Sequence, residues 1–178
     1  MDFEGKPLGP ERGRTIALIP ETPEVYPTLT VWEHLAFVAR ATRRPAGWEA
    51  RADALLARFG LAGRRDALGE TLSKGLRQKT LIAATVIAET PVLLIDEPMV
   101  GLDPLGQREL RELFLELRAS GVAIVMSTHL IEQAESLCDR LVILCNGTAV
   151  ANGTIEELRA AATGHSLEDI FLELTGSR

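Results

Sequence analysis

Apolar residues form four short runs along the chain, each bounded by polar or turn-forming residues. The runs cover Thr15–Ile19, Val92–Ile95, Val122–Met126 and Leu141–Cys145. Short apolar runs of this kind are typical of strands in a parallel sheet, and we expect the second and third to be buried. The pattern therefore predicts a mostly parallel sheet made of these strands.

The stretches between these runs have the spacing of amphipathic helices. Val31 begins an apolar stripe that recurs at i, i+4, i+7 and i+8, and Thr30 and Glu33 have the spacing of a capping box ahead of it. Similar patterns predict helices at about 47–59, 74–89, 105–119, 130–138 and 167–174, with a loop at 61–71. Strands and helices that succeed one another in this way predict the α/β class.

Turn-forming residues join the last elements. Asn146 and Gly147 are a type I′ turn signal, which predicts a hairpin between the run at 141–145 and residues 148–151. Thr154 and Glu157 have the spacing of a second capping box. The final helix is expected to end at Gly176.

Two carboxylates, Asp96 and Glu97, directly follow the run at 92–95. We expect them at the carboxyl edge of the sheet, which is where open α/β sheets bind ligands. The structural alternative for this pair is to cap a helix or to stabilise a loop.

The segments on either side of this strand carry further candidate chemistry. Upstream, Ser73 is suited to cap a helix, Gly75 is small, and the free N–H groups of a helix start suit an anion. Downstream, residues 101–104 read as a turn, in which Asp103 caps the next helix and Pro104 takes its first position.

Four segments resemble motifs of the ATP-binding-cassette (ABC) ATPases, in the order found in that family. LSKGLRQ at 72–78 resembles the LSGGQ-type signature, and VLLIDE at 92–97 resembles the Walker B strand with its catalytic glutamate. GLD at 101–103 resembles the D-loop, and STH at 127–129 resembles the segment with the switch histidine. The resemblance covers about residues 12–178 and implies a P-loop NTPase-type, mostly parallel sheet flanked by helices.

The resemblance also implies a division of the chain. Residues 28–90 correspond to the helical signature subdomain, whose outer surface receives membrane subunits in the family. Residues 1–27 and 91–152 correspond to the nucleotide-binding core, and residues 153–178 to C-terminal helices.

Four residues are implied to act on ATP and Mg²⁺ bound by their own subunit. Asp96 holds Mg²⁺, usually through water, and Glu97 polarises the attacking water. His129 donates to the γ-phosphate or orients that water, whereas a lone histidine is more often structural. Glu21 stands where the family has the glutamine of its Q-loop. A carboxylate also binds a hard cation, so Glu21 is a candidate Mg²⁺ ligand, with an exposed loop glutamate as the alternative.

Other residues are implied to act on ATP held by a second subunit. Ser73 and Gly75 contact its γ-phosphate, and Gln78 belongs to the same nucleotide-binding signature. Asp103 crosses the same interface. The resemblance thus predicts a homo- or heterodimer with another cassette, in which two chains stack head to tail around two ATP molecules.

The residues that cradle phosphate in this family are missing from the sequence. Gly9–Thr15 contains two glycines, but three residues separate them instead of four, Arg14 replaces the lysine, and a strand is predicted next. Residues 1–14 are therefore expected to form a loop, and the fold is expected to be incomplete, without its P-loop strand and helix. In the family that strand lies between those matched by 122–126 and 141–145, which predicts a gap or a distorted pairing there.

Composition narrows the setting further. The 178 residues are 46% hydrophobic and 25% charged, as in ordinary globular proteins, and a net charge of −6 disfavours nucleic-acid binding. Cys138 and Cys145 lack metal-ligand spacing, and we expect small buried thiols. The longest apolar stretch, 80–88, is shorter than the ~20 residues that span a bilayer, and no leader opens the chain. A cytoplasmic protein is predicted, and the resemblance places it on the inner face of the cell membrane.

Three functions are open on the sequence alone. The first is an ABC-type ATPase: the ATP-binding and hydrolysing subunit of a transporter, whole or amino-terminally shortened, that powers a transmembrane permease. Export is favoured because LEDIFLELT at 167–175 resembles an ending common in export-type cassettes. The second is a degenerate cassette that supplies its signature in trans, and the third is a regulatory interaction module. Retention of Asp96, Glu97 and His129 favours the first, although we expect the isolated chain to be inactive.

Overall fold

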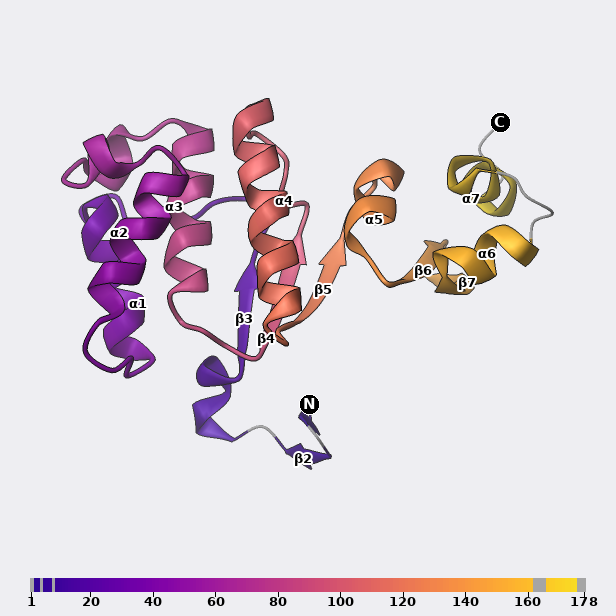
Figure 1. The fold of residues 1–178 in the computed structure, drawn as a ribbon, viewed down its shortest axis with the longest axis horizontal. Coiled ribbons are helices and arrows are strands. Elements are labelled where there is room, and N and C mark those ends of the chain that lie inside the picture. Colours follow the sequence, from indigo (N-terminus) through magenta and orange to yellow (C-terminus); the bar gives the residue numbers. More distant parts are fainter. Residues whose placement is uncertain (1, 4, 8, 162–165, 176–178) are drawn as a thin grey trace. The chain divides into compact units, whose positions relative to one another are not determined.

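The computed structural model describes residues 2–3, 5–7, 9–161 and 166–175. The chain divides into two compact units, 1–127 and 128–178 (Figure 1). Helices and parallel strands make up the first unit, and a hairpin with short helices makes up the second. The mixed α/β class predicted from the sequence is confirmed.

The first unit is built on a parallel sheet of three strands. These are β3 (Ile16–Ile19), β4 (Val92–Asp96) and β5 (Ala123–Ser127), in the order β3-β4-β5. Ile19 pairs with Ile95, and Asp96 pairs with Ser127, so that all three strands end at the same edge. Three of the four predicted strands are thus present, parallel and adjacent.

Four α-helices accompany this sheet. They are α1 (Val31–Ala41), α2 (Trp48–Arg58), α3 (Lys74–Val86) and α4 (Pro104–Ala119), and Figure 1 shows the first three grouped beside β3. The predicted capping box of α1 is present. Thr30 Oγ1 accepts from the N–H of Glu33 at 3.2 Å, and the N–H of Thr30 donates to Glu33 Oε2 at 2.8 Å.

The predicted loop at 61–71 contains two 3₁₀ turns instead, η2 (Ala62–Arg64) and η3 (Gly69–Thr71). These turns are tied to α1, because the N–H groups of Val31 and Trp32 donate to the carbonyls of Ala67 and Arg65, each at 3.0 Å. The start of a helix leaves such N–H groups without intrahelical partners. A tertiary contact therefore orders a segment whose composition alone predicts a loop.

The amino-terminal segment is more ordered than the predicted loop at 1–14. β1 (Asp2–Phe3) pairs antiparallel with β2 (Lys6–Pro7), and the 3₁₀ turn η1 (Pro10–Arg14) follows. β3 comes directly after η1, so a strand stands where a P-loop requires a helix. The segment around Arg14 is therefore not built as a phosphate loop.

The central strand of the sheet is more deeply buried than its neighbour β5. Leu93 and Ile95 of β4 are buried, as predicted, but Val125 of β5 is 62% exposed, while Ile124 and Met126 are half-buried. The prediction of a buried strand at 122–126 is thus wrong. Within the described part of the chain, β5 pairs with β4 alone, so one of its edges lacks a neighbouring strand.

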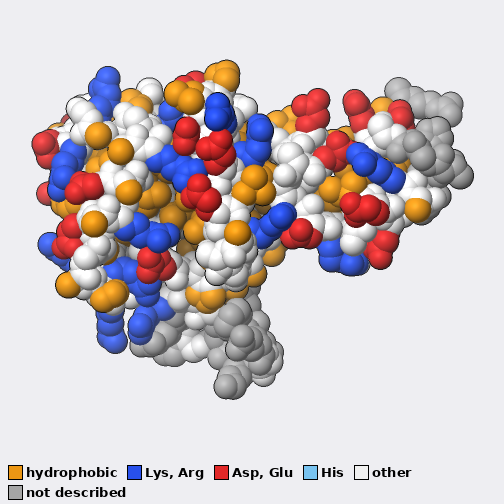
Figure 2. All heavy atoms as spheres, viewed as in Figure 1, with side chains coloured by type: hydrophobic (Ala, Val, Ile, Leu, Met, Phe, Trp, Pro, Cys, Tyr) orange, Lys and Arg blue, Asp and Glu red, His pale blue; other side chains and the backbone are white. Residues whose placement is uncertain are grey.

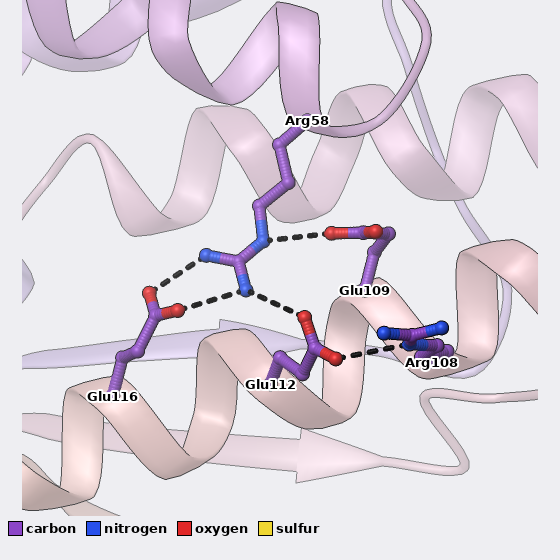
Figure 3. Close-up of polar contacts among 5 residues, drawn as sticks. All are labelled: Arg58, Arg108, Glu109, Glu112 and Glu116. Carbon is purple, nitrogen blue, oxygen red and sulfur yellow. Dashed lines mark hydrogen bonds and ion pairs between the residues drawn. The ribbon is translucent and has the colours of Figure 1, made fainter.

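An ion-pair cluster joins α2 to α4 on the surface of the first unit (Figure 3). Arg58 donates to both carboxylate oxygens of Glu116, at 2.7 and 3.0 Å, and its Nε lies 3.3 Å from Glu109 Oε2. Hydrogen bonding to Glu116 raises the pKa of Arg58 and lowers that of Glu116. On the face of the first unit drawn in Figure 2, acidic and basic side chains are interspersed.

The second unit contains a hairpin and three short helices. Its elements are α5 (Ile131–Leu137), β6 (Arg140–Cys145), β7 (Thr148–Thr154), α6 (Ile155–Ala161) and α7 (Leu167–Thr175). Asn146 and Gly147 have φ of 50° and 75°, as a type I′ turn requires, which confirms the predicted hairpin. The capping box is also confirmed, since the N–H of Thr154 donates to Glu157 Oε2 at 2.8 Å. Gly176 lies outside the described residues.

The strand at 141–145 does not extend the parallel sheet, which corrects the four-strand prediction. β6 pairs antiparallel with β7, and the described residues show no other partner for it. The tight turn at 146–147 brings β7 to one edge of β6, and no pairing joins β6 to β5.

Burial in the second unit is limited. Ile143, Leu158, Leu167 and Ile170 form a small apolar cluster, whereas Val142 and Leu144 on the other face of β6 are 57% and 66% exposed. Cys138 and Cys145 are half-buried, not buried as predicted. Among the described residues, no helix has the length and apolar character that a membrane span requires.

Candidate functional site

Asp96 and Ser127 mark the carboxyl edge of the sheet in the first unit. They are paired in register at the ends of β4 and β5, and Ser127 Oγ donates to Asp96 Oδ1 at 2.5 Å. The Asp96 side chain is exposed. The hydroxyl of Ser127 therefore orients a carboxylate that remains accessible to a ligand.

Glu97 lies at the sharp turn that follows β4. Its φ is +44°, which is uncommon for a residue with a side chain, and its N–H donates to the carbonyl of Ser127 at 3.0 Å. Backbone strain of this kind costs roughly 1–3 kcal/mol and gathers at functional sites. The turn places the half-buried Glu97 directly beside Asp96 at the sheet edge.

Glu21 lies at the same edge of the sheet. β3 ends at Ile19, in register with Ile95 of β4, and the exposed Glu21 follows two residues later. Parallel strands bring their carboxyl ends together, so Glu21 and Asp96 leave the sheet on the same side. The structure thus gathers both predicted Mg²⁺ ligands at one edge.

Gly75 allows the start of α3 to touch the turn after β4. Ser73 caps α3, with its Oγ accepting from the N–H of Leu76 at 3.4 Å. A Cβ placed on Gly75 would lie 2.8 Å from the carbonyl oxygen of Gly101, too close for any side chain. Gly101 has φ of +81°. The signature segment and the D-loop segment are therefore in direct contact, and glycine is needed on both sides.

Asp103 is the N-cap residue of α4, as predicted, but its side chain is directed to another partner. Its side chain makes no capping hydrogen bond, and its Oδ1 instead accepts from Lys79 Nζ at 2.8 Å. The hydrogen bond from the Lys79 ammonium lowers the pKa of Asp103 below its ordinary value. Pro104 takes the first helical position, as predicted.

Gln78 differs from the other signature residues, because its side chain is in the interior. It is 1% exposed, and neither atom of its amide has a hydrogen-bond partner in the described part of the chain. A buried polar group left unpaired costs about 1–3 kcal/mol. The structure does not bring Gln78 to the surface on which the exposed Ser73 and Asp103 lie.

His129 belongs to the second unit and follows β5 by two residues. It is exposed, and the turn around it is fixed by Thr128, whose Oγ1 accepts from the N–H of Leu130 at 3.1 Å. The loop that carries His129 is thus held by a hydrogen bond between a side chain and the backbone of the loop itself.

Two contributors to this site escape sequence reasoning. Lys79 lies 24 positions before Asp103, and nothing in the sequence marks the two as partners. Ser127 is visible in the STH segment, but its hydrogen bond to Asp96 depends on the register of β4 and β5. Only the pairing of distant segments identifies these two residues.

Comparison with known proteins identifies the class. The ABC transporter family model matches residues 2–100. The chain is 40% identical, over 181 residues, to the ABC-type transporter ATP-binding protein EcsA of Bacillus subtilis (strain 168), covering 98% of this chain and 73% of that protein. It is 30% identical to the lipopolysaccharide export system ATP-binding protein LptB of Haemophilus influenzae, covering 88% and 66%.

Solved structures agree with this assignment. A structure titled as the ATP binding subunit of an ABC transporter has a TM-score of 0.89 and 41% identity, over 94% of this chain and 71% of that chain. The structure of cbiO1 from Clostridium perfringens, part of the ABC transporter complex cbiONQ, has a TM-score of 0.67 and 26% identity, over 93% and 74%. The chain belongs to the ABC transporter family, among its ATP-binding proteins.

Proposed function

We propose that this chain is the ATP-binding and hydrolysing subunit of an ABC exporter, which powers transport by a transmembrane permease at the inner face of the cell membrane. The observation that carries the proposal is the sheet edge where Asp96 and Glu97 follow β4 beside Ser127. Family membership supports ATP binding and hydrolysis in general. Export is supported by the relative LptB, an ATP-binding protein of a lipopolysaccharide export system, and by the ending at 167–175.

The residues at this edge fit Mg²⁺. Asp96 and Glu21 offer exposed carboxylate oxygens on the same side of the sheet, and oxygen is the ligand that this hard cation prefers. Bound there, Mg²⁺ would neutralise charge on the β- and γ-phosphates. Glu97 would hold and polarise the attacking water, and His129 would donate a hydrogen bond toward the γ-phosphate.

The start of α3 and the D-loop segment would serve a second subunit. Ser73 and Gly75 present the free N–H groups of a helix start, which suit the γ-phosphate of ATP bound by a partner cassette. Asp103 follows Gly101, whose carbonyl oxygen abuts Gly75, and is hydrogen-bonded to Lys79 of α3, and we place it in the same interface. The proposal therefore includes a homo- or heterodimer of cassettes.

The groups that bind phosphate within one subunit are not among these 178 residues. The sequence contains no GxxxxGK[ST] motif, and η1 leads into a strand. Carboxylates alone repel an anionic nucleotide. We therefore predict that the 178-residue chain neither binds ATP at millimolar concentration nor hydrolyses it, which titration calorimetry and a phosphate-release assay measure.

A completed chain tests the function. An upstream segment with a GxxxxGK[ST] loop, taken from an active ABC ATPase, is fused ahead of residue 1. We call this fusion the completed chain. Mg²⁺-dependent hydrolysis should appear, and Glu97→Gln should abolish it while ATP-bound dimers accumulate. Glu24→Gln, at an exposed carboxylate of the same unit, is the matched control. A completed chain that binds ATP without hydrolysing it would overturn the proposal.

A second candidate is a non-hydrolytic cassette that serves its partner in trans. The direct contact of Gly75 with Gly101 favours it, since that surface forms without a P-loop. In this case the 178-residue chain should restore hydrolysis to a cassette whose own signature has been inactivated. The completed chain should then remain inactive, which separates the two candidates.

A further inference from the structure

Lys79 is a half-buried cation with an exposed anionic partner. Its side chain is 14% exposed, whereas that of Asp103 is 58% exposed, and the Nζ–Oδ1 distance is 2.8 Å. Lysine is seldom buried unless it is paired. The hydrogen bond therefore holds one oxygen of Asp103 from the interior side, while most of the carboxylate faces solvent.

Gly106 provides the space for this pair. A Cβ placed on Gly106 would lie 2.7 Å from both Asp103 Oδ1 and Lys79 Cε. Glycine inside a helix costs up to about 1 kcal/mol relative to alanine, so its place in the first turn of α4 needs a packing reason. Room for the Lys79–Asp103 contact is that reason.

A second contact holds the same two segments together. Gly75 leaves no space beside the carbonyl of Gly101, and the side chain of Lys74 lies 3.6 Å from the Cβ position of Gly101. The start of α3 is thus fixed to the turn before α4 at Gly101, and its second turn is fixed to Asp103 by Lys79. Two separate contacts restrict motion of one segment relative to the other.

We propose that Lys79 is a positioning residue, which fixes the Asp103 carboxylate relative to Ser73 and Gly75 so that all three meet the partner's nucleotide together. This inference rests on the proposed function, because it gives Lys79 a task only where Asp103 lies in the cassette interface. The residue does not touch nucleotide itself. It acts through the hydrogen bond that fixes the position of the Asp103 carboxylate.

The test compares variants of the completed chain at a temperature well below unfolding. Lys79→Gln should lower kcat roughly tenfold, because small misplacements at an active site are costly, while KM for ATP stays within about twofold. Lys79→Arg, which keeps the cation, should retain most of kcat. Arg108→Gln removes an exposed cation of α4 that pairs with Glu112, and it should leave kcat unchanged.

A carboxyl titration of Asp103 by NMR accompanies the kinetics. The pKa of Asp103 should rise in Lys79→Gln and remain low in Lys79→Arg. An unchanged kcat in Lys79→Gln, with only a lower melting temperature, would overturn the inference and leave the proposed function standing. An inactive wild-type completed chain would overturn the proposed function and this inference with it. The two failures are therefore distinguishable.

Discussion

Two regions of the first unit differ in how many contacts hold them within the described residues. The signature and D-loop surface, formed by residues 73–79 and 101–106, is closed by glycine contacts and by the Lys79–Asp103 hydrogen bond. The edge of β5 is open, with Val125 62% exposed and β4 as its only strand partner in the described chain. Both regions flank the same strand end at Asp96.

The difference between these two regions matches two tasks that we propose within one family fold. The closed surface carries the residues that we propose to act on a partner's nucleotide, and its geometry depends on contacts within this chain. The open edge belongs to β5, and β5 ends at Ser127, the partner of Asp96. The surface that we propose to act in trans is thus held by contacts within this chain, whereas β5 has one edge without a strand partner in the described residues. Five predictions test this contrast.

The open edge should dominate the behaviour of the 178-residue chain. Each large apolar side chain left exposed forfeits roughly 1.5–3 kcal/mol, against a typical total stability of about 5–15 kcal/mol. Val125 on this strand is more than half exposed, as are Val142 and Leu144 on β6 of the second unit, which add to the effect. We expect a melting temperature below ~60 °C and aggregation in light scattering.

A single charge on that edge should reduce the aggregation. Val125→Lys places a lysine on the open strand, a device that natural edge strands use against association. Leu115→Lys on α4, also partly exposed, is the control and should change little. A monodisperse wild-type chain that melts cooperatively above ~60 °C would contradict this account.

The closed surface should be sensitive to a single methyl group. Gly75→Ala forces a Cβ to 2.8 Å from a backbone oxygen, and overpacking of this kind costs about 1–3 kcal/mol. Denaturant unfolding measures the loss. Gly63→Ala is the control, because no atom lies within 4 Å of its Cβ position. Equal stabilities of the two variants would show that the α3 contact with Gly101 is loose.

The ion pairs between α2 and α4 hold two helices of the first unit together without any glycine contact. Hydrogen bonds to charged groups contribute about 1.5–3 kcal/mol, so Arg58→Met should lower the unfolding free energy by roughly 1–3 kcal/mol. Glu109→Gln alone should cost less than about 1 kcal/mol, since Glu116 still binds Arg58. Arg111→Met, an exposed arginine of α4, is the control. The loss should shrink in 1 M salt, and a salt-independent loss would point to packing instead.

The smallest effect concerns pH. The pKa of Asp103 is lowered in the folded state by Lys79, so its stabilising contribution is present above the ordinary value of 3.8 and is lost as pH falls through the folded value. Lys79→Gln should therefore be less stable than wild type near neutral pH, and the two should converge in acid. Unfolding curves at pH 7 and pH 3 measure this, with Arg108→Gln as control. A constant difference at both pH values would exclude the ion pair as its cause.

Local sequence patterns predict the individual elements well. The capping boxes at Thr30 and Thr154 and the Asn146-Gly147 turn have the expected geometry, because each depends on residues only a few positions apart. The run at 92–95 also becomes the central strand, with Asp96 and Glu97 at its end. Local chemistry and the order of four motifs were enough to identify the family.

Errors arose wherever distant segments decide the outcome. The run at 122–126 has the composition of a buried strand, but burial depends on a neighbour that the described residues do not supply. The run at 141–145 pairs with β7 because a two-residue turn brings that strand alongside it. Cys138 and Cys145 are half-buried, a property that an apolar pattern alone does not reveal.

The sequence by itself determined the family, the helices and strands, and the chemical types at the candidate site. Only the tertiary structure decided which of these residues share a surface: it paired the Asp103 side chain with Lys79, placed Gln78 in the interior, and joined Ser127 to Asp96. The physical reason is the distance along the sequence over which each interaction acts. Propensities and caps act over a few residues, whereas the Lys79–Asp103 contact spans 24 positions and exists only where α3 packs against the start of α4.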